Sequence, residues 1–514
     1  MEKRLVKGVV TTVSFLTIIT IVSKLLGLLR EVGIAASFGV GLTTDAFYAA
    51  LIIPALLFTS VGVAIQNLFM IEFTKIKKLY EDKNEESKLS SNISNILLLT
   101  SFVIFILSFI FTKPIIRVIA PGFEDPVKLE LTIKLTRILL PTMVIIPLYQ
   151  IRASMLRVYN KFITVSVIDL GFNLFQIAYL LLFSTKFGIE GLAISILAAY
   201  LTQWITIEVI AFRMGFRHKA ILNFNDSHFR TILRLFIPTF ISFGIIQVNA
   251  MVDKMIASNL GDGAISALSF GFMVRNIVYT ILISQLLVVI YPMLLKHEEH
   301  KDEKAYTELG LTTFKLIWSL VLPLSVILIV FSDSVIRILF ERGDFDGAAT
   351  KITAGVLFYY AIGITFFAVR EFFIHIAYTK KNTKMPLYIT LIGALLNIIF
   401  SIILKTYMGV NGIAFGLAIS EIITAIVIVC YNHKNKYLDM SHLFNDFIKI
   451  LVINLVLGLG LYFLYPYLYL PATSIVEVLM VLIYGLIFLG LYYLALSLFR
   501  VTIIKDLIKQ LKGE

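Results

Sequence analysis

The chain has 514 residues, of which 59% are hydrophobic and 15% are charged, whereas soluble globular proteins are about half apolar and a quarter charged. This composition excludes an ordinary soluble domain and indicates a protein that crosses a membrane several times. The formal net charge of +12 comes mainly from short loops, so it predicts contact with anionic lipid and not with nucleic acid. The single cysteine, Cys430, excludes an internal disulfide and a cysteine-based zinc site.

Apolar segments long enough to cross a bilayer, which takes about 20 residues, follow one another along the whole chain. The first begins at Gly8 and is too long for the apolar core of a signal peptide, so we expect it to be a span. Pro141 and Pro147 predict a kink in the fourth. The fourteen expected spans cover residues 8–29, 45–72, 89–111, 131–151, 164–184, 188–212, 231–256, 265–294, 308–331, 351–378, 385–404, 411–432, 446–467 and 475–499.

Positive charges gather in alternate loops, for example at Lys77 and Lys78 after the second span and at Lys380 and Lys381 after the tenth. The positive-inside rule places these loops and both termini in the cytoplasm, which agrees with an even number of spans. The loops on the other side are too short to hold a catalytic domain. Residues 501–514 predict a cationic amphipathic helix on the cytoplasmic surface.

Three segments recur at nearly one spacing and indicate an internal duplication. IAASFG from Ile34 returns as IASNLG 222 residues later, IIRVIAPGF from Ile115 returns as VIRILFERGDF after 220, and GIEGLAIS from Gly188 returns as GVNGIAFGLAIS after 221. Each repeat holds six spans, and an even number gives both repeats the same orientation in the membrane. We therefore expect an N-lobe (1–212), a linker (213–230), a C-lobe (231–432), and two extra spans (446–499).

Several charged residues lie in or beside the expected spans, where a charge at the bilayer centre costs about 2.5–3.5 kcal/mol. Lys24 and Arg30 belong to the first span or its end, Arg275 to the eighth and Arg370 to the tenth. These cations predict a water-filled, positively charged cavity between two lobes. Because Arg offers a planar fork of donors and Lys a point charge, such a cavity suits an anion and above all a diphosphate.

The sequence is also compatible with structural roles for the same residues. Arg30 is able to pair with Glu31, Lys24 is able to reach the headgroups, and Arg370 is able to pair with Glu371. We interpret other acids in the spans as structural or interfacial, namely Asp169, Glu208 and Glu421.

Motifs for catalysis are lacking. There is no Walker A sequence, no G-x-S-x-G and no Cys–His pair, and His297 and His300 lie in a charged loop typical of a solvated surface. We therefore expect no enzyme activity, no resident cofactor and no metal site. Transport would then draw on Na⁺, on the membrane potential or on the gradient of the substrate.

The segment SKLLGLLREVGIAASFGVGLTTDAFYAALIIP (Ser23–Pro54) resembles the opening of the MurJ family, the lipid II flippases of the multidrug/oligosaccharidyl-lipid/polysaccharide exporter superfamily. Further resemblances are VIAPGF from Val118, LRVYNKF from Leu156, VDKMIASNLGDGAISALSFGFMVRNIV from Val252 and ILFERGDFD from Ile338. The resemblance implies an all-α fold of fourteen spans, two six-helix lobes with alternating access, and two C-terminal helices that form a groove for the lipid tail.

The resemblance also assigns roles to single residues. It implies that Lys24, Arg30, Asp45 and Arg275 bind substrate and that Asp253 and Asn397 belong to a sodium site. The implied partner is lipid II, in the bacterial plasma membrane. We expect a monomer as the default oligomeric state. Departures from the family pattern at Phe58, Thr59, Val274 and Ser401 leave another undecaprenyl-linked oligosaccharide, of capsule or O-antigen type, open as cargo. A cation-coupled multidrug exporter and a membrane glycosyltransferase are the remaining alternatives.

Overall fold

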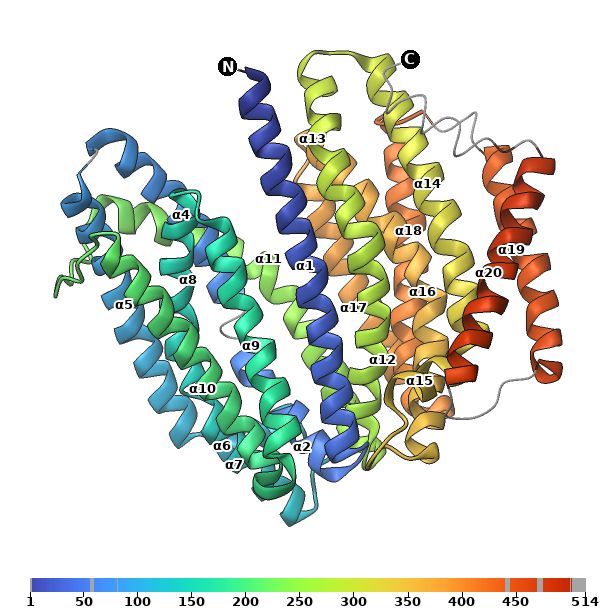
Figure 1. The fold of residues 1–514 in the computed structure, drawn as a ribbon, viewed down its shortest axis with the longest axis horizontal. Helices are drawn as coiled ribbons and strands as arrows, with labels where there is room; N and C mark the ends of the chain where they lie inside the picture. The colour runs from blue at the N-terminus through green and yellow to red at the C-terminus, as the bar shows by residue number, and fades with distance from the viewer. Residues whose placement is uncertain are drawn as a thin grey trace. The chain divides into compact units, whose positions relative to one another are not determined.

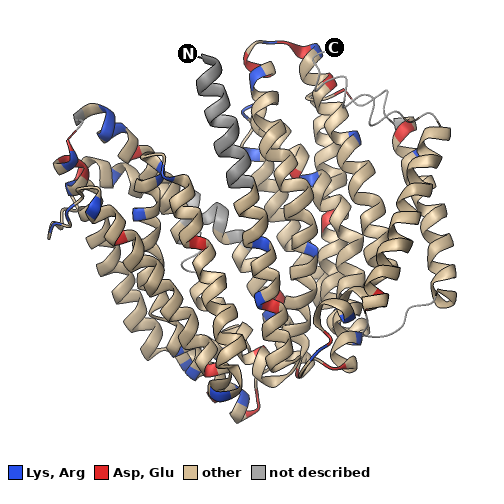
Figure 2. Cartoon of the chain, viewed as in Figure 1, with Lys and Arg blue, Asp and Glu red and all other residues tan. Residues whose placement is uncertain are grey.

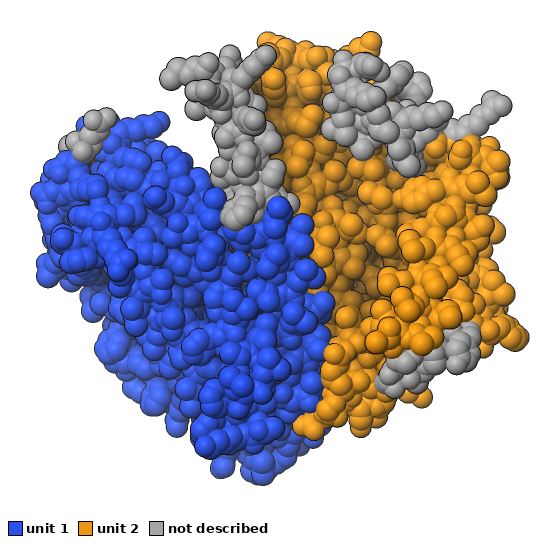
Figure 3. Space-filling model, in the orientation of Figure 1, with its two compact units in different colours: residues 1–266 blue, residues 267–514 orange. Residues whose placement is uncertain are grey.

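The computed structural model describes residues 2–55, 60–80, 82–439, 444–468, 475–499 and 501. This part of the chain is helical and contains no β-strand. It divides into two compact units, Met1–Ser266 and Ala267–Glu514, which Figure 3 colours blue and orange. The helix expected as the seventh span belongs to the first unit, while the lobe limits at 212 and 231 stay predictions. The amphipathic tail expected after residue 501 lies outside the described residues.

Unit 1 consists of long helices joined by short turns, drawn from blue to green in Figure 1. The helix expected as the second span is divided, because α2, the short α3 and α4 occupy its place. The kink expected at Pro141 is confirmed, since the helix is interrupted at residues 140–141. The helices are α1 (Glu2–Phe38), α2 (Leu42–Ala50), α3 (Ile52–Pro54), α4 (Ser60–Tyr80), α5 (Lys83–Ile110), α6 (Thr112–Ile119), α7 (Pro126–Leu139), α8 (Thr142–Val158), α9 (Phe162–Leu182), α10 (Ser184–Arg213), α11 (Ser227–Ala257) and the 3₁₀ turn η2 (Ser258–Leu260).

Unit 2 continues in the same manner and ends in two helices that follow the second repeat. The eighth expected span is one helical path in which a π-helical turn separates α12 from α13. Such a turn inserts an extra residue into the helix and is frequent at functional sites. The elements are α12 (Ala264–Tyr279), η3 (Thr280–Ser284), α13 (Gln285–Glu299), α14 (Glu303–Val330), α15 (Ser332–Phe340), α16 (Gly347–Thr379), α17 (Lys384–Met408), α18 (Val410–Lys434), α19 (Phe444–Leu464), η4 (Tyr465–Tyr467) and α20 (Ile475–Leu498).

Eleven helical segments of the described chain are long and apolar enough to cross a membrane. They correspond to the third to sixth and the eighth to fourteenth expected spans, so the protein is a multi-pass membrane protein. The first, second and seventh expected spans fall on α1, on α2 to α4 and on α11. These three are not among the eleven, and the total of fourteen stays a prediction. In Figure 2 much of the length of the helices is free of charged residues, as a bilayer requires.

Both units have glycines with positive φ at corresponding positions. Gly188 precedes the main part of α10 and Gly409 precedes α18, with φ of 55° and 58°. Gly39 and Gly261, another matched pair, also have positive φ values of 62° and 92°. Side chains other than glycine rarely adopt this left-handed region. The short helices α6 and α15 likewise occupy matching places between two long helices, so the duplication seen in the sequence extends to local structure.

Aspartate residues begin several of the helices. The side chains of Asp82, Asp125, Asp226, Asp302 and Asp346 each accept a hydrogen bond from a backbone N–H in the first turn of the helix that follows. Such caps satisfy donors that a helix start leaves without partners and stabilise it by about 1 kcal/mol. They fix where α5, α7, α11, α14 and α16 begin.

The connection between α10 and α11 lies along a polar face of α5. The side chain of Asn92 donates to Asn223 O at 2.9 Å and accepts from Asn223 N at 2.6 Å. Asn95 Nδ2 donates to the carbonyl oxygens of Lys219 and Ile221, both at 2.8 Å. The segment expected as an inter-lobe linker is thus held on unit 1 by side chains that take the place of backbone partners.

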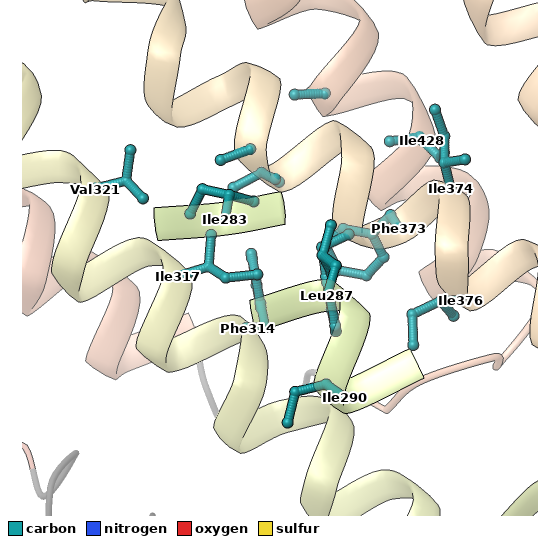
Figure 4. Close-up of a cluster of buried hydrophobic side chains, with 14 of the residues drawn as sticks. Ile283, Leu287, Ile290, Phe314, Ile317, Val321, Phe373, Ile374, Ile376 and Ile428 are labelled. Atoms are coloured by element: carbon teal, nitrogen blue, oxygen red, sulfur yellow. The ribbon is translucent and has the colours of Figure 1, made fainter. Parts of the chain in front are cut away.

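A large cluster of buried apolar residues in unit 2 surrounds the π-helical turn. Ile283 and Leu287 pack there with Phe314 of α14, Phe373 of α16 and Ile428 of α18 (Figure 4). The two final helices attach to this core through α14, because Leu322 packs with residues of α19 and α20. This apolar core therefore lies next to the C-terminal end of α12, the helix that carries Arg275.

Candidate substrate-binding site

Unit 1 contains a cavity of about 340 Å³ lined by residues of α1 to α3 and of α7 to α11. Its walls are mainly apolar. The ionisable residues in the lining are Arg30, Glu31, Tyr48, Tyr200 and Lys254. A mostly apolar pocket with a few convergent polar groups is the usual form of a small-molecule site, and this volume is near the lower end of the range of roughly 300–1,000 Å³.

Arg30 enters the cavity from α1 and is held on both sides. Its Nη2 donates to Glu31 Oε1 at 2.6 Å, and its Nη1 donates to Asn173 Oδ1 at 3.3 Å. The guanidinium carbon also lies 5.8 Å from the ring centroid of Phe172. The pair with Glu31 that the sequence left open is therefore present, yet both residues line the cavity. A guanidinium has five N–H donors, so donors remain for a ligand.

Glu31 is occupied on both carboxylate oxygens, whereas Lys254 has no anion of its own. Arg30 uses one oxygen of Glu31, and the hydroxyl of Tyr48 donates to the other. Lys254 Nζ lies 5.6 Å from the ring centroid of Tyr48, and no carboxylate within the described residues forms an ion pair with it. Two cations and one anion leave the cavity with one net positive charge, which attracts an anion strongly in a site of low dielectric constant.

Lys24 lies outside this cavity. It is exposed on α1, seven residues before Glu31, so it projects from nearly the same side of the helix about 10 Å away along the axis. Its place in substrate binding stays a prediction.

Asp45 also lies outside the cavity, in a polar cluster of unit 1. Its fully buried carboxylate accepts from Lys128 Nζ at 3.0 Å, from Gly263 N at 2.8 Å, and from both the backbone N and the hydroxyl of Ser266 at 2.8 Å. Lys128, itself buried, also pairs with Asp262 at 2.8 Å. Four donors saturate the carboxylate of Asp45, so in this arrangement it serves the structure, and substrate contact by Asp45 stays a prediction.

Unit 2 has a second buried group of charges, from α12, α16 and α18. Arg275 Nη2 donates to Glu421 Oε1, and both side chains are almost fully buried. Arg370 pairs with Glu371 at 3.3 Å, as the sequence left open. The ring of Phe367 lies 4.8 Å from the guanidinium carbon of Arg275 and 4.9 Å from that of Arg370, which is within the range of cation–π contacts.

Comparison with known proteins identifies the family. The family model described as lipid II flippase MurJ matches residues 34–484. The chain belongs to the MurJ family. A probable lipid II flippase MurJ of Buchnera aphidicola subsp. Acyrthosiphon pisum is 26% identical over 443 residues, covering 85% of this chain and 86% of the relative. One from Thermotoga maritima is 26% identical over 404 residues, covering 78% and 81%.

Solved structures agree with this assignment. A structure named lipid II flippase MurJ, inward closed conformation, has a TM-score of 0.79 and 27% identity, and the match covers 94% of this chain and 99% of that one. An inward-facing multidrug resistance MATE transporter of the MOP superfamily has a TM-score of 0.61 with 14% identity, covering 80% and 94%. The second likeness concerns the fold alone. The recognition of the MurJ family from its sequence motifs is confirmed.

The residues that the MurJ resemblance assigned to sodium lie in different units. Asp253 is half-buried in α11 of unit 1, and Asn397 is fully buried in α17 of unit 2, where Ser401 Oγ donates to its Oδ1 at 3.2 Å. Among the described residues, no group of three or more His, Cys, Asp or Glu side chains is arranged to hold a metal ion. Sodium coupling through Asp253 and Asn397 stays a prediction.

Sequence reasoning missed two members of these charge groups. The sequence analysis did not assign Lys254 to the binding residues, and it interpreted Glu421 as structural or interfacial. The signal available for Lys254 was its place beside Asp253, at the end of a span that matches the first span of the other repeat. No local signal assigns Glu421 to Arg275, because the two residues are 146 positions apart.

Proposed function

We propose that the protein is a lipid II flippase, which carries the undecaprenyl-diphosphate glycan from the inner to the outer leaflet of the bacterial plasma membrane. Membership of the MurJ family supports this proposal most strongly. The positively charged cavity of unit 1 supports it independently, because Arg30 and Lys254 are suited to a diphosphate.

The proposed mechanism requires binding and release only. Arg30 would bind phosphate oxygens through the N–H donors of its planar guanidinium, and Lys254 would add a point charge. Arg275 and Arg370 would supply the cations of the other unit, and Lys24 would contact the substrate along α1. The polyprenyl tail would remain in lipid beside α19 and α20. Because no bond is formed or broken, the protein would be a transporter and not an enzyme.

Transport would proceed by alternating access, in which the site opens first to one leaflet and then to the other. Coupling to Na⁺ through Asp253 and Asn397, or to the membrane potential acting on the charged headgroup, would supply the energy. The positive-inside pattern supports cytoplasmic termini, and we propose that a monomer suffices.

The proposal is tested by rescue of a bacterial strain depleted of its own lipid II flippase. We expect the wild-type gene to restore growth and Arg30→Ala and Arg275→Ala to reduce rescue strongly at equal protein levels. Lys134→Ala serves as a matched control, since Lys134 pairs with Glu190 on an exposed surface. Full rescue by both arginine variants would contradict the proposal. Rescue of a strain lacking a capsule or O-antigen flippase, but not of this one, would instead indicate a different glycan.

A further inference from the structure

Glu421 is a buried carboxylate for which the proposed transport cycle gives no role. It projects from α18 and is 2% exposed. One oxygen accepts from Arg275, which is itself 5% exposed. The other oxygen, Oε2, is buried and has no hydrogen-bond partner. Leaving a buried charged acceptor unsatisfied is costly, so its presence calls for an explanation other than stability.

The position of this free oxygen depends on Gly363 of α16. A Cβ atom at Gly363 would collide with Glu421 Oε2 and lie 3.0 Å from Cα of Ala418. The close approach of α16 and α18 therefore leaves just enough room for the carboxylate at this point. The carboxylate of Glu421 packs directly against the backbone of α16 at Gly363. A slight displacement of either helix would therefore change its hydrogen bond with Arg275.

The second arginine of this group is also held by an acid. Arg370 pairs with Glu371, while its own Nε is buried without a partner, and it is close enough to Glu421 to interact with it electrostatically. Two arginines and two carboxylates leave the group with no net charge. A monoanion that approaches such a group gains little, because each guanidinium already has a counter-ion.

We propose that Glu421 is a specificity-determining counter-ion: it occupies Arg275 when the site is empty and yields only to a ligand with more charge and more acceptor oxygens than a single phosphodiester. This inference rests on the proposed function and deepens it. The diphosphate bridge of lipid II carries two negative charges, whereas phosphatidylglycerol, an abundant membrane anion, carries one. Glu421 would thus exclude bulk anionic phospholipid from the arginines that bind the substrate.

The proposal predicts unequal effects on the binding of two lipids when the charge of Glu421 is removed. Glu421→Gln retains the shape and one hydrogen-bond acceptor but no longer repels or competes with an anion. Binding of phosphatidylglycerol should become about tenfold tighter, because a charge-assisted partner of Arg275 has been removed. Binding of lipid II should change less, so the ratio of the two affinities should fall. Gly363→Ala, which displaces the carboxylate without removing it, should lower the ratio to a smaller extent.

The experiment is a titration of the purified full-length protein with lipid II and with phosphatidylglycerol, followed by native mass spectrometry. Wild type, Glu421→Gln, Gly363→Ala and Arg275→Gln are compared. Glu208→Gln is the matched control, since Glu208 pairs with the buried Arg152 of unit 1 at 2.7 Å. It tests the effect of breaking a buried arginine pair elsewhere, and the affinity ratio should remain that of wild type.

The outcomes separate this inference from the proposed function. If wild type prefers lipid II, Arg275→Gln loses it, and Glu421→Gln and Gly363→Ala keep the wild-type ratio, the counter-ion role is refuted and the flippase proposal stands. Equal loss of both lipids in Glu421→Gln would likewise refute it, because that result indicates a purely structural role. If wild type shows no preference for lipid II, the proposed function and this inference both fail. Should Glu421→Gln not fold, Gly363→Ala and Glu421→Asp decide the question.

Discussion

Lys254 Nζ lies 5.6 Å from the ring centroid of Tyr48, whose hydroxyl donates to Glu31. The tyrosine therefore separates the ammonium group from an acid whose oxygens are already taken by Arg30 and by Tyr48 itself. An aromatic ring compensates a cation only in part, by about 0.5–2 kcal/mol. Lys254 is thus the charge of the cavity that is best placed to gain from an incoming anion.

Replacing Lys254 by Gln should reduce transport without harming the fold. We expect weak rescue of a flippase-depleted strain and weaker binding of lipid II. The midpoint of thermal unfolding in detergent should stay equal or rise, because a half-buried cation without an ion-pair partner is unfavourable in the empty protein. A fall in the midpoint that accounts for the lost rescue would show that Lys254 stabilises unit 1 and does not bind substrate.

The cluster around Asp45 should contribute to the stability of unit 1. Asp45→Asn removes the charge that balances Lys128, a buried lysine that then keeps only the half-exposed Asp262. Breaking a buried pair in this way typically costs about 3–5 kcal/mol, so the thermal midpoint should fall clearly. Lys128→Met alone should also destabilise, and the double variant should be less affected than the sum of the two. Additive effects would mean that the two residues do not depend on each other.

The sequence predicts the helical class well, and it singles out Arg30, which lines the cavity of unit 1. Apolar length and charge in loops are local properties, and the glycines at 188 and 409 are needed for the same backbone turn. The residues that complete each charge group are not local. Glu421 pairs with Arg275, and Lys254 lines the same cavity as Arg30, only because of how separate helices pack. The periodicity of one helix does not predict which other helix its apolar face will contact. The interruption at Leu51, between α2 and α3, was not predicted, because apolar residues continue across it.

An ion pair should contribute, beside apolar packing, to the attachment of the final helix to unit 2. Arg337 of α15 donates to Glu477 of α20 from Nε at 2.9 Å and from Nη2 at 2.6 Å, and Glu477 is fully buried. Arg337→Met should lower the thermal midpoint, since it removes the cation that compensates the charge of a buried carboxylate. Adding Glu477→Leu should restore much of the loss. If the single variant behaves as wild type, the attachment of α20 depends on its apolar contacts alone.

The connection from α10 to α11 should open more readily when the side-chain hydrogen bonds of Asn92 are removed. Asn92→Ala deletes both hydrogen bonds to the backbone of Asn223. Hydrogen–deuterium exchange of residues 217–225 should become faster by about tenfold or more, since local opening then costs less. Exchange in α16 provides the internal reference and should not change. Equal exchange in both proteins would show that other contacts hold this segment.

The central claim, that a positively charged cavity carries lipid II across the membrane, is tested most directly by transport in liposomes. Purified protein is reconstituted with lipid II placed on one side, and a membrane-impermeant reagent measures how much reaches the other side with time. The account predicts rapid transfer by wild type and slow transfer by Arg30→Ala and Lys254→Gln. Transfer by wild type no faster than in protein-free liposomes, or equal transfer by all three proteins, would contradict it.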